Sequence, residues 1–380
     1  MTVYCTAPWN GFTVREDGSV KTCCAGSAVL GNLKTSSMAE ILNSQPLKKI
    51  QSILEQGQVP THNCQSCVSQ ERLTGLASLR QHYLKHYPNV YSGLKLNNLD
   101  IRWNNSCNLS CQYCGPTFSS TWQKKLHIPV SSPVKPYQDE LEQFILDNID
   151  QVQEITLVGG EPMLMKQNAN LLQKLPPQTK ISVITNIAYD LERMPYMQSL
   201  LDRPRENLLW SLSLENTGSQ FEYVRNGASW AEVERNIGFL QQHWPNTVNV
   251  LMVYSALSAF GLTNTLTQFH ALGLKKFYFQ TYFGNPAFDV FAMPLEIQNI
   301  AAQELRSAVA FHQSQLHPDD INLYPIENAN AILDKLGTDP TRSLTRQEFL
   351  DHVAWCDQWT NLRFSALWPD VIDLVDLYLK

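Results

Sequence analysis

Three cysteines crowd one short stretch of the chain, SCNLSCQYCGP at residues 106–116. Cys107, Cys111 and Cys114, here called the triad, have the spacing C-x3-C-x2-C. Three thiolates on one loop can bind three irons of a cubic [4Fe–4S] cluster and leave the fourth iron free for another ligand. The same thiolates could hold zinc if a distant side chain supplied a fourth ligand. The spacing favours the cluster and leaves zinc open.

A second set of cysteines lies near the start of the chain. It comprises Cys5, Cys23, Cys24, Cys64 and Cys67. Residues 11–23 predict a β-hairpin, because two alternating runs flank an Asp-Gly turn signal. Residues 36–57 predict a helix that a proline interrupts, and a CxxC follows in a predicted loop. A hairpin, a helix and a CxxC loop can bring four thiolates together, either around iron and sulfide or around zinc.

The elements that must position the triad follow a regular rhythm from about residue 94. Short apolar runs alternate with helix-length segments, which is typical of βα units and a parallel sheet. The runs are LKLNNLDIRW, QEITLVGG, TKISVITN, LLWSLSLE, TVNVLMVYSA and KKFYFQTY. Six strands are too few for a closed eight-stranded barrel, so we expect an α/β fold with a partial (β/α)6 barrel.

The chain divides into four predicted regions. A small N-terminal α+β hairpin-helix domain with the second cysteine set covers 1–75, and a helical connector covers 76–93. The partial barrel covers 94–290, and a helical C-terminal extension without a chemical motif covers 291–380. The triad follows the first barrel strand, at the strand end where such folds place their chemistry.

A second motif, GGEPM at 159–163, follows the second predicted barrel strand. The pair Gly159 and Gly160 would let a small ligand approach the backbone closely. Glu161 beside it could bind an ammonium group. A tight turn ending in an exposed carboxylate is the structural alternative for this motif taken alone.

With its aromatic Tyr113 before the last cysteine, the triad followed by GGEP on six βα units resembles the radical S-adenosylmethionine (radical SAM) superfamily. The resemblance covers roughly residues 94–290. It implies that the triad binds a [4Fe–4S] cluster whose open iron binds S-adenosylmethionine, and that Gly159, Gly160 and Glu161 line this cofactor. It also implies reductive cleavage of S-adenosylmethionine to a 5′-deoxyadenosyl radical, which abstracts hydrogen from a substrate.

The same resemblance implies four further cofactor contacts. Ser213 and Glu215, in SLSLEN, are two residues apart and share one face of a strand. Arg225, in YVRNG, can approach the carboxylate of the cofactor, with a surface salt bridge as the alternative. Asn186, ending VITN, could face the site, with a helix N-cap as the alternative.

The N-terminal cysteines resemble the twitch form of the SPASM domain, which holds an auxiliary cluster. The resemblance implies that Cys5, Cys23, Cys64 and Cys67, here called the quartet, bind a second [4Fe–4S] cluster, although this module usually follows the barrel. A structural zinc site stays open as the alternative. Cys24 and Cys356 are predicted to be structural.

These features lead to three functional hypotheses. The first is a radical SAM oxidoreductase or maturase that abstracts hydrogen from a peptide or protein for oxidation or crosslinking. The second is a dehydrogenase of a small polyol or aminosugar, and the third is a non-catalytic iron–sulfur or zinc protein. Both enzymes would need an external electron donor of the flavodoxin or ferredoxin type. Alternating residues on the sixth strand, Tyr278, Gln280 and Tyr282, are candidate substrate contacts, and no acid or base is assigned.

Composition and charge limit the classes of partner and the cellular compartment that we expect for this protein. The chain has 380 residues, a net charge of −6 and no basic run longer than a pair, which disfavours a nucleic-acid surface. No signal peptide or membrane span is evident in the sequence, so we expect a cytoplasmic protein without a membrane partner. In that compartment nine cysteines indicate metal or redox chemistry before disulfides.

Overall fold

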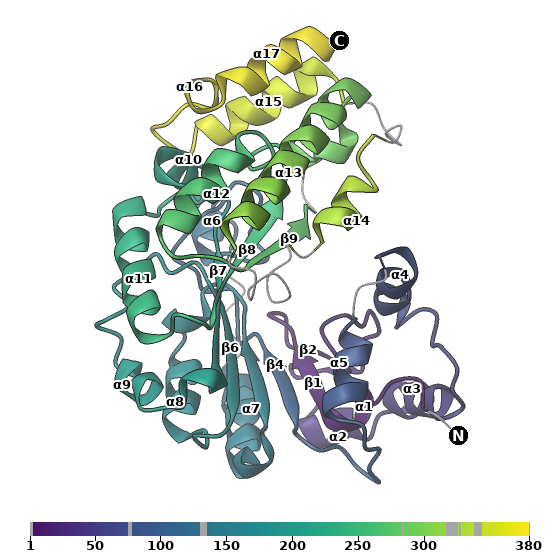
Figure 1. Ribbon diagram of the computed structural model, residues 1–380. Helices are drawn as coiled ribbons and strands as arrows, with labels where there is room; N and C mark the ends of the chain where they lie inside the picture. The colour runs from purple at the N-terminus through teal and green to yellow at the C-terminus, as the bar shows by residue number, and fades with distance from the viewer. Residues whose placement is uncertain are drawn as a thin grey trace. The chain divides into compact units, whose positions relative to one another are not determined.

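A computed structural model describes residues 3–74, 78–129, 135–282, 285–316, 326, 328–337 and 344–379 (Figure 1). The chain forms two compact units. Unit 1 comprises residues 1–107, 116–185 and 194–210. Unit 2 comprises residues 108–115, 186–193 and 211–380. Each unit is described by itself.

The sheet of unit 1 joins the N-terminal hairpin to the first barrel strands. Its order is β3 (Gly31–Asn32), β2 (Ser19–Lys21), β1 (Gly11–Val14), β4 (Asn98–Ile101), β5 (Glu154–Leu157) and β6 (Lys180–Thr185). The hairpin β1–β2 is antiparallel and turns at Asp17-Gly18, where Gly18 has a φ of +83°. Strand β1 then pairs in parallel with β4, and β4, β5 and β6 are parallel neighbours.

Helices of unit 1 pack around this sheet. They are α1 (Ala7–Asn10), α2 (Met38–Leu42), α3 (Gln45–Glu55), α4 (Gln65–Thr74), α5 (Leu79–His86), α6 (Ser120–Lys125), α7 (Lys135–Asp147), α8 (Lys166–Lys174) and α9 (Met197–Leu201). The helix predicted over 36–57 is two helices, because Ser44 caps a new helix whose first turn contains Pro46. Helix α1 packs against α3 and α5 (Figure 1).

Unit 2 holds the rest of the parallel strands and the C-terminal extension. Strand β7 (Leu208–Ser213) begins in unit 1 and ends in unit 2. Strands β8 (Val248–Tyr254) and β9 (Phe277–Thr281) pair in parallel. The helices are α10 (Gly218–Val224), α11 (Trp230–His243), α12 (Leu262–Ala271), α13 (Leu295–Gln315), α14 (Ala329–Leu333), α15 (Arg346–Asp357), α16 (Phe364–Leu367) and α17 (Pro369–Tyr378). All six predicted barrel strands are present, and the α/β class is confirmed.

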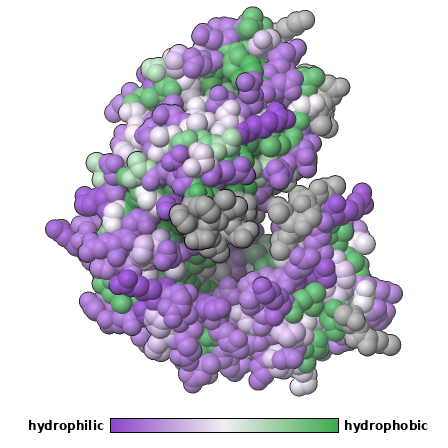
Figure 2. Space-filling model, in the orientation of Figure 1, coloured by the Kyte–Doolittle hydropathy of each residue, from purple (hydrophilic) through white to green (hydrophobic). Residues whose placement is uncertain are grey.

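Alternation along the strands gives each unit one tightly packed face. In β8 the side chains of Val250 and Met252 are fully buried, whereas the intervening Leu251 is only half-buried. Over the face drawn in Figure 2 most side chains are hydrophilic and the apolar ones are scattered. Across the described ranges, no helix combines the length and hydropathy that crossing a bilayer requires.

A histidine pair between α12 and α13 makes the stability of unit 2 sensitive to acid. His270 Nε2 lies 2.9 Å from Nδ1 of the fully buried His312. Burial, and to a lesser extent the neighbouring His312, lowers the pKa of His270 to about 4. Burial alone lowers the pKa of His352 to about 4. Both histidines bind protons more tightly in the unfolded chain than in the folded one. Their contribution to the free energy of unfolding is therefore complete above pH 6.5 and is lost as the pH falls toward 4.

We therefore expect the melting temperature to fall steadily between pH 6.5 and pH 4.5, measured by thermal unfolding. H270Q should reduce the slope of this fall. H62Q, at an exposed histidine, serves as the control and should leave the slope unchanged. An identical slope in H270Q would contradict the assignment.

Candidate metal centres and cofactor site

All four thiols of the quartet line one cavity in unit 1. Cys5 precedes α1 and Cys23 follows β2, so the hairpin brings together two residues far apart in sequence. The CxxC was predicted to lie in a loop, and Cys64 does precede α4, but Cys67 belongs to the first turn of that helix. Spacing of three residues at a helix start puts both thiols on one face.

The predicted connector helix α5 completes this cavity. Arg80 and Tyr83 from α5 line it beside Tyr4. Arg80 is held by Glu71 at 2.6 Å and donates to the carbonyl oxygen of Tyr4 at 3.2 Å. The exposed Cys24 is not among the residues that line the cavity.

The donor chemistry of the cavity fits a cationic group. Burial, with a smaller contribution from neighbouring thiols of the quartet, raises the pKa of Cys5 and of Cys23 to about 12. Four thiolates are therefore unfavourable together without a bound cation, which would supply the compensating charge. Within the described ranges, no three or more His, Cys, Asp or Glu side chains are arranged to hold a single metal ion. The fit rests on the shared cavity and on the donor set.

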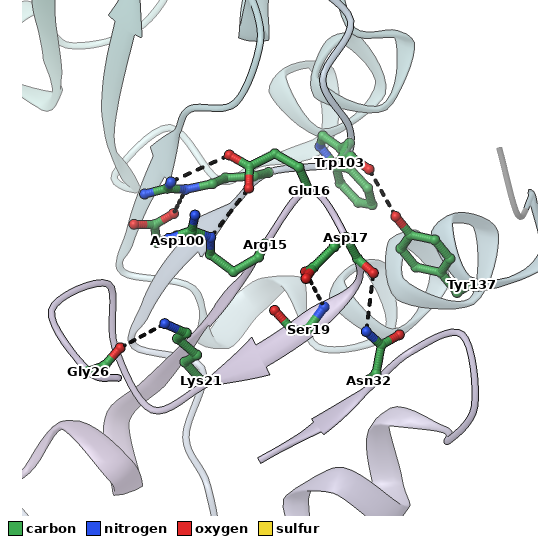
Figure 3. A network of polar contacts seen from close by, with 11 residues as sticks. Arg15, Glu16, Asp17, Ser19, Lys21, Gly26, Asn32, Asp100, Trp103 and Tyr137 are labelled. Atoms are coloured by element: carbon green, nitrogen blue, oxygen red, sulfur yellow. Dashed lines mark hydrogen bonds and ion pairs between the residues drawn. The ribbon is translucent and has the colours of Figure 1, made fainter. Parts of the chain in front are cut away.

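A polar network fixes the end of β4, from which the chain enters the triad loop (Figure 3). Arg102 lies 3.4 Å from Asp100 and 3.5 Å from Glu16, the latter from the hairpin. One residue on, the Trp103 carbonyl oxygen accepts a hydrogen bond from Tyr137 at 3.2 Å. Hairpin and helix α7 thus both hold the strand that leads to Cys107.

Cys107 itself is anchored at the start of α6. Its backbone N–H donates to Ser120 Oγ at 3.1 Å, and its carbonyl oxygen accepts from Thr121 Oγ1 at 2.7 Å. These contacts fix the backbone of the first triad residue.

The GGE motif packs directly against the backbone that precedes Cys107. A side chain on Gly160 would place its Cβ 2.2 Å from the carbonyl oxygen of Ser106, and the Glu161 N–H donates to that same oxygen at 2.7 Å. Gly159 has a φ of +125°, which favours glycine. We expected the glycines to let a ligand approach the backbone, and at Gly160 it is the Ser106 backbone that approaches.

Glu161 is buried, and its carboxylate accepts from Thr185 Oγ1 at 2.7 Å and from the Met163 N–H at 3.2 Å. It caps the short 3-10 helix Pro162–Leu164. The alternative of an exposed carboxylate is therefore wrong, because the motif turns the side chain inward between β5 and β6.

Substituting Gly160 tests this packing. In G160A the added methyl group must displace backbone atoms of Ser106 and Asn105, which lie within 2.7 Å of the position that its Cβ would take. We expect a loss of about 1–3 kcal/mol in the free energy of unfolding and a lower iron content after reconstitution. G115A is the matched control in the triad loop, because its Cβ would meet no atom within 4 Å. Equal stability and iron content in the two variants would contradict this packing role.

In unit 2, the triad loop is held by the segment after α10. The Ser110 N–H donates to the Asn226 carbonyl oxygen at 2.9 Å, and the Gln112 N–H donates to that of Val224 at 2.8 Å. The Cys114 N–H closes a turn on the Cys111 carbonyl oxygen at 3.0 Å. Backbone hydrogen bonds thus hold the YVRNG segment beside the second and third triad cysteines.

Arg225 of this segment forms a buried ion pair with Glu215, so the alternative of a surface salt bridge is wrong. Its Nε and Nη2 donate to the two carboxylate oxygens at 2.8 Å each, and Nη1 lies 3.9 Å from Cys111 Sγ. Burial lowers the pKa of Arg225, but Glu215 and other nearby groups, including Cys111, outweigh it and hold the pKa above its usual value. Glu215 follows β7, whose last residue is the half-buried Ser213.

Asn186 follows β6 and does not cap a helix. Its amide donates to Asn108 Oδ1 at 3.0 Å, and its Oδ1 accepts from the Ala188 N–H at 2.9 Å. Asn108, the residue after Cys107, in turn donates to the Ala188 carbonyl oxygen at 2.6 Å. Asn186 is therefore bonded to the triad loop within unit 2.

The three candidate substrate residues differ in their surroundings. Tyr278 is half-buried and Gln280 is exposed, on the face of β9 opposite the buried Phe279. Tyr282 is buried, beyond the end of the strand, and its hydroxyl has no hydrogen-bond partner among the described residues.

Sequence reasoning missed the contacts that the C-terminal extension makes. Gln112 Nε2 reaches the Cys356 carbonyl oxygen at 3.5 Å, and Asn226 Nδ2 donates to that of Trp359 at 2.9 Å. Tyr223 donates to Asp357 at 2.8 Å. Nothing in the sequence signals these partners, because they lie more than 100 residues apart.

Two family matches cover the cysteine sets. Residues 5–68 match SPASM, described as an iron-sulfur cluster-binding domain, and residues 93–188 match Fer4_12, described as a 4Fe-4S single cluster domain. No curated protein matches the sequence significantly.

The chain is also similar to solved structures at low identity. "Native anSMEcpe with bound AdoMet" is 16% identical over 60% of this chain and 62% of that chain, with a TM-score of 0.42. Streptococcus suis SuiB is 16% identical over 58% of this chain and 47% of that chain, with a TM-score of 0.40. The structure of SuiB bound to precursor peptide SuiA is 17% identical over 63% of this chain and 53% of that chain, with a TM-score of 0.37. The chain spans less than two thirds of the length of these proteins.

The two family matches confirm the resemblance that the cysteine spacing predicted. Residues 5–68 are similar to SPASM-type iron–sulfur domains, and residues 93–188, which contain the triad, are similar to 4Fe–4S single-cluster domains. Both descriptions specify iron–sulfur clusters, which favours these over zinc at the quartet as well as at the triad.

Proposed function

We propose that the chain is a radical SAM oxidoreductase that modifies a side chain of a peptide or protein substrate. When bound, the triad cluster would supply the electron that cleaves S-adenosylmethionine, and the quartet cluster would take up the electron left on the oxidised substrate. An external donor of the flavodoxin or ferredoxin type would supply the first electron.

The shared cavity of the quartet is the observation that carries this proposal. An oxidation that begins with loss of a hydrogen atom leaves one electron to be removed, and a second cluster site within the same chain offers an acceptor. The cavity is lined by four cysteines that bind metal as thiolates, and by Arg80, whose charge favours that form. A non-catalytic protein would not require a second site of this kind.

The chain's own residues would hold S-adenosylmethionine as follows. Gly159 and Gly160 present backbone next to the triad loop, and Glu161 fixes the turn through its buried hydrogen bonds. The resemblance gives Asn186, Ser213, Glu215 and Arg225, all in unit 2, as further cofactor contacts. Because Arg225 and Glu215 are already paired, they would meet the cofactor as a preorganised unit.

A peptide fits the open face of β9 better than a small polyol. Tyr278 and Gln280 present an aromatic ring and an amide that are only partly covered, in register with Leu251 and Val253 of β8. This strip mixes apolar and amide groups and has no charged side chain. It suits an extended peptide, whereas a polyol would need several hydroxyl-binding partners. The polyol or aminosugar dehydrogenase remains the second candidate.

Deuterium transfer tests the proposal and separates the candidates. The reconstituted enzyme is incubated anaerobically with dithionite, S-adenosylmethionine and either a perdeuterated peptide digest or a perdeuterated cyclitol. We expect 5′-deoxyadenosine to carry deuterium only with the peptides, measured by mass spectrometry. Deuterium from the cyclitol alone would support the polyol dehydrogenase. No 5′-deoxyadenosine in either reaction, with the clusters present, would support the non-catalytic protein.

A further inference from the structure

Arg225 has one edge of its guanidinium group committed and another directed at a predicted cluster ligand. Nε and Nη2 form the edge that faces Glu215, with both donor–acceptor distances at 2.8 Å. The remaining nitrogen, Nη1, points to Cys111 Sγ at 3.9 Å. A guanidinium group is planar and rigid, so fixing one edge also fixes the direction of the other donors.

Glu215 is itself held in place. Besides Arg225, its Oε1 accepts from the Tyr113 hydroxyl at 3.0 Å and lies 3.5 Å from the Val253 N–H on β8. The Arg225 guanidinium carbon lies 5.5 Å from the centre of the Tyr113 ring. Tyr113 is flanked in sequence by the second and third triad cysteines, so the loop that carries the thiols also positions the guanidinium group.

Burial shields this contact from water. Glu215 is 0% exposed and Arg225 is 5% exposed, so water does not compete for the guanidinium group. A hydrogen bond from a charged donor to a thiolate is stronger there than at the surface. Hydrogen bonds to cluster sulfurs are among the features that set the reduction potential of an iron–sulfur cluster.

We propose that Arg225 is a positioning residue that donates a hydrogen bond to the Cys111 thiolate and thereby raises the reduction potential of the triad cluster. Adding one electron to the cluster increases the negative charge on its sulfur ligands, so the donor stabilises the reduced state more than the oxidised state. Glu215 keeps the donor aimed and balances its charge. The inference rests on the proposed function only in assuming that the triad holds the cluster.

Two substitutions that keep the net charge of the site separate the hydrogen bond from simple charge. R225K retains one positive charge, but a lysine paired with Glu215 has no rigid second edge for Cys111. The double variant R225M/E215M removes both charges, which avoids leaving Glu215 buried without a partner. R235M removes an arginine whose side chain is 54% exposed, and serves as the control.

The midpoint potential is measured by EPR-monitored dithionite titration without S-adenosylmethionine, so that no cofactor contact contributes. All variants carry C64A, which removes the quartet cluster. In R225K and R225M/E215M we expect the ratio of reduced to oxidised cluster at a fixed potential to fall about tenfold, a shift of about −59 mV for a one-electron couple. The exchangeable-proton coupling to the reduced cluster should weaken in both variants, whereas R235M should match its parent.

An unchanged midpoint potential and unchanged proton coupling in both charge-conserving variants would overturn the inference. Failure of the proposed function looks different, because the C64A parent would then show no reducible cluster, or the signal would persist when the triad is replaced by alanine. A shifted potential with an intact signal therefore supports Arg225 specifically.

Discussion

Replacing Cys111 with alanine should abolish the triad cluster and all cleavage of S-adenosylmethionine. The reconstituted wild type should contain about eight irons, and C111A about four, because one cubic cluster loses a ligand that no other residue supplies. The measurement is anaerobic iron and sulfide content, together with 5′-deoxyadenosine formed under dithionite. Formation of 5′-deoxyadenosine should fall to background.

The fold should survive this change, which makes the result interpretable. Two hydrogen bonds hold this part of the loop, from the Cys114 N–H to the Cys111 carbonyl oxygen and from the Gln112 N–H to the Val224 carbonyl oxygen, and alanine retains the backbone atoms that form them. The ion pair of Arg225 and Glu215 also remains intact. We expect a destabilisation of about 1 kcal/mol. C356A removes a buried thiol outside both cysteine sets and should keep full iron and full cleavage. Cleavage retained in C111A would refute the assignment of the triad.

Replacing Cys64 should separate cleavage of S-adenosylmethionine from product formation. C64A removes one of four thiols around the quartet cavity, so iron should again fall from about eight to about four, with the triad cluster left in place. 5′-Deoxyadenosine should still form in the presence of a peptide substrate. Product should be lost by at least tenfold, because the electron left on the substrate has no acceptor. Both compounds are measured in one reaction by mass spectrometry.

C24A is the matched control for C64A. Cys24 is adjacent to Cys23 but exposed and outside the set of residues that line the cavity, so its loss should change neither iron content nor turnover. If C24A lost iron as C64A does, Cys24 would be a ligand and the quartet would need to be redrawn. If C64A changed neither property, the auxiliary-cluster assignment would be wrong.

The sequence by itself determined the features that are encoded within short windows. The spacing of the triad requires only that three thiols share one loop, and strand alternation requires only a period of two. All six barrel strands were predicted in this way, as was the hairpin turn at Asp17-Gly18. One local error arose at an element boundary, because Cys67 lies in a helix and not in a loop. The interruption predicted at Pro46 within 36–57 is confirmed, because a new helix begins at Gln45.

Only the tertiary structure decided which distant groups meet. The sequence predicted that a hairpin, a helix and a CxxC could bring the quartet together, and the structure shows the cavity that joins the chain before α1, the end of β2 and the start of α4. Gly160 was expected to make room for a ligand, and it also makes room for the Ser106 backbone.

From the sequence, Arg225 could contact either the cofactor carboxylate or an acidic side chain at the surface. The structure adds Cys111 as a partner. The contact of Gln112 with Cys356 spans 244 residues. Such pairings depend on how whole elements pack and on which buried polar groups must be satisfied, and no local pattern carries that information.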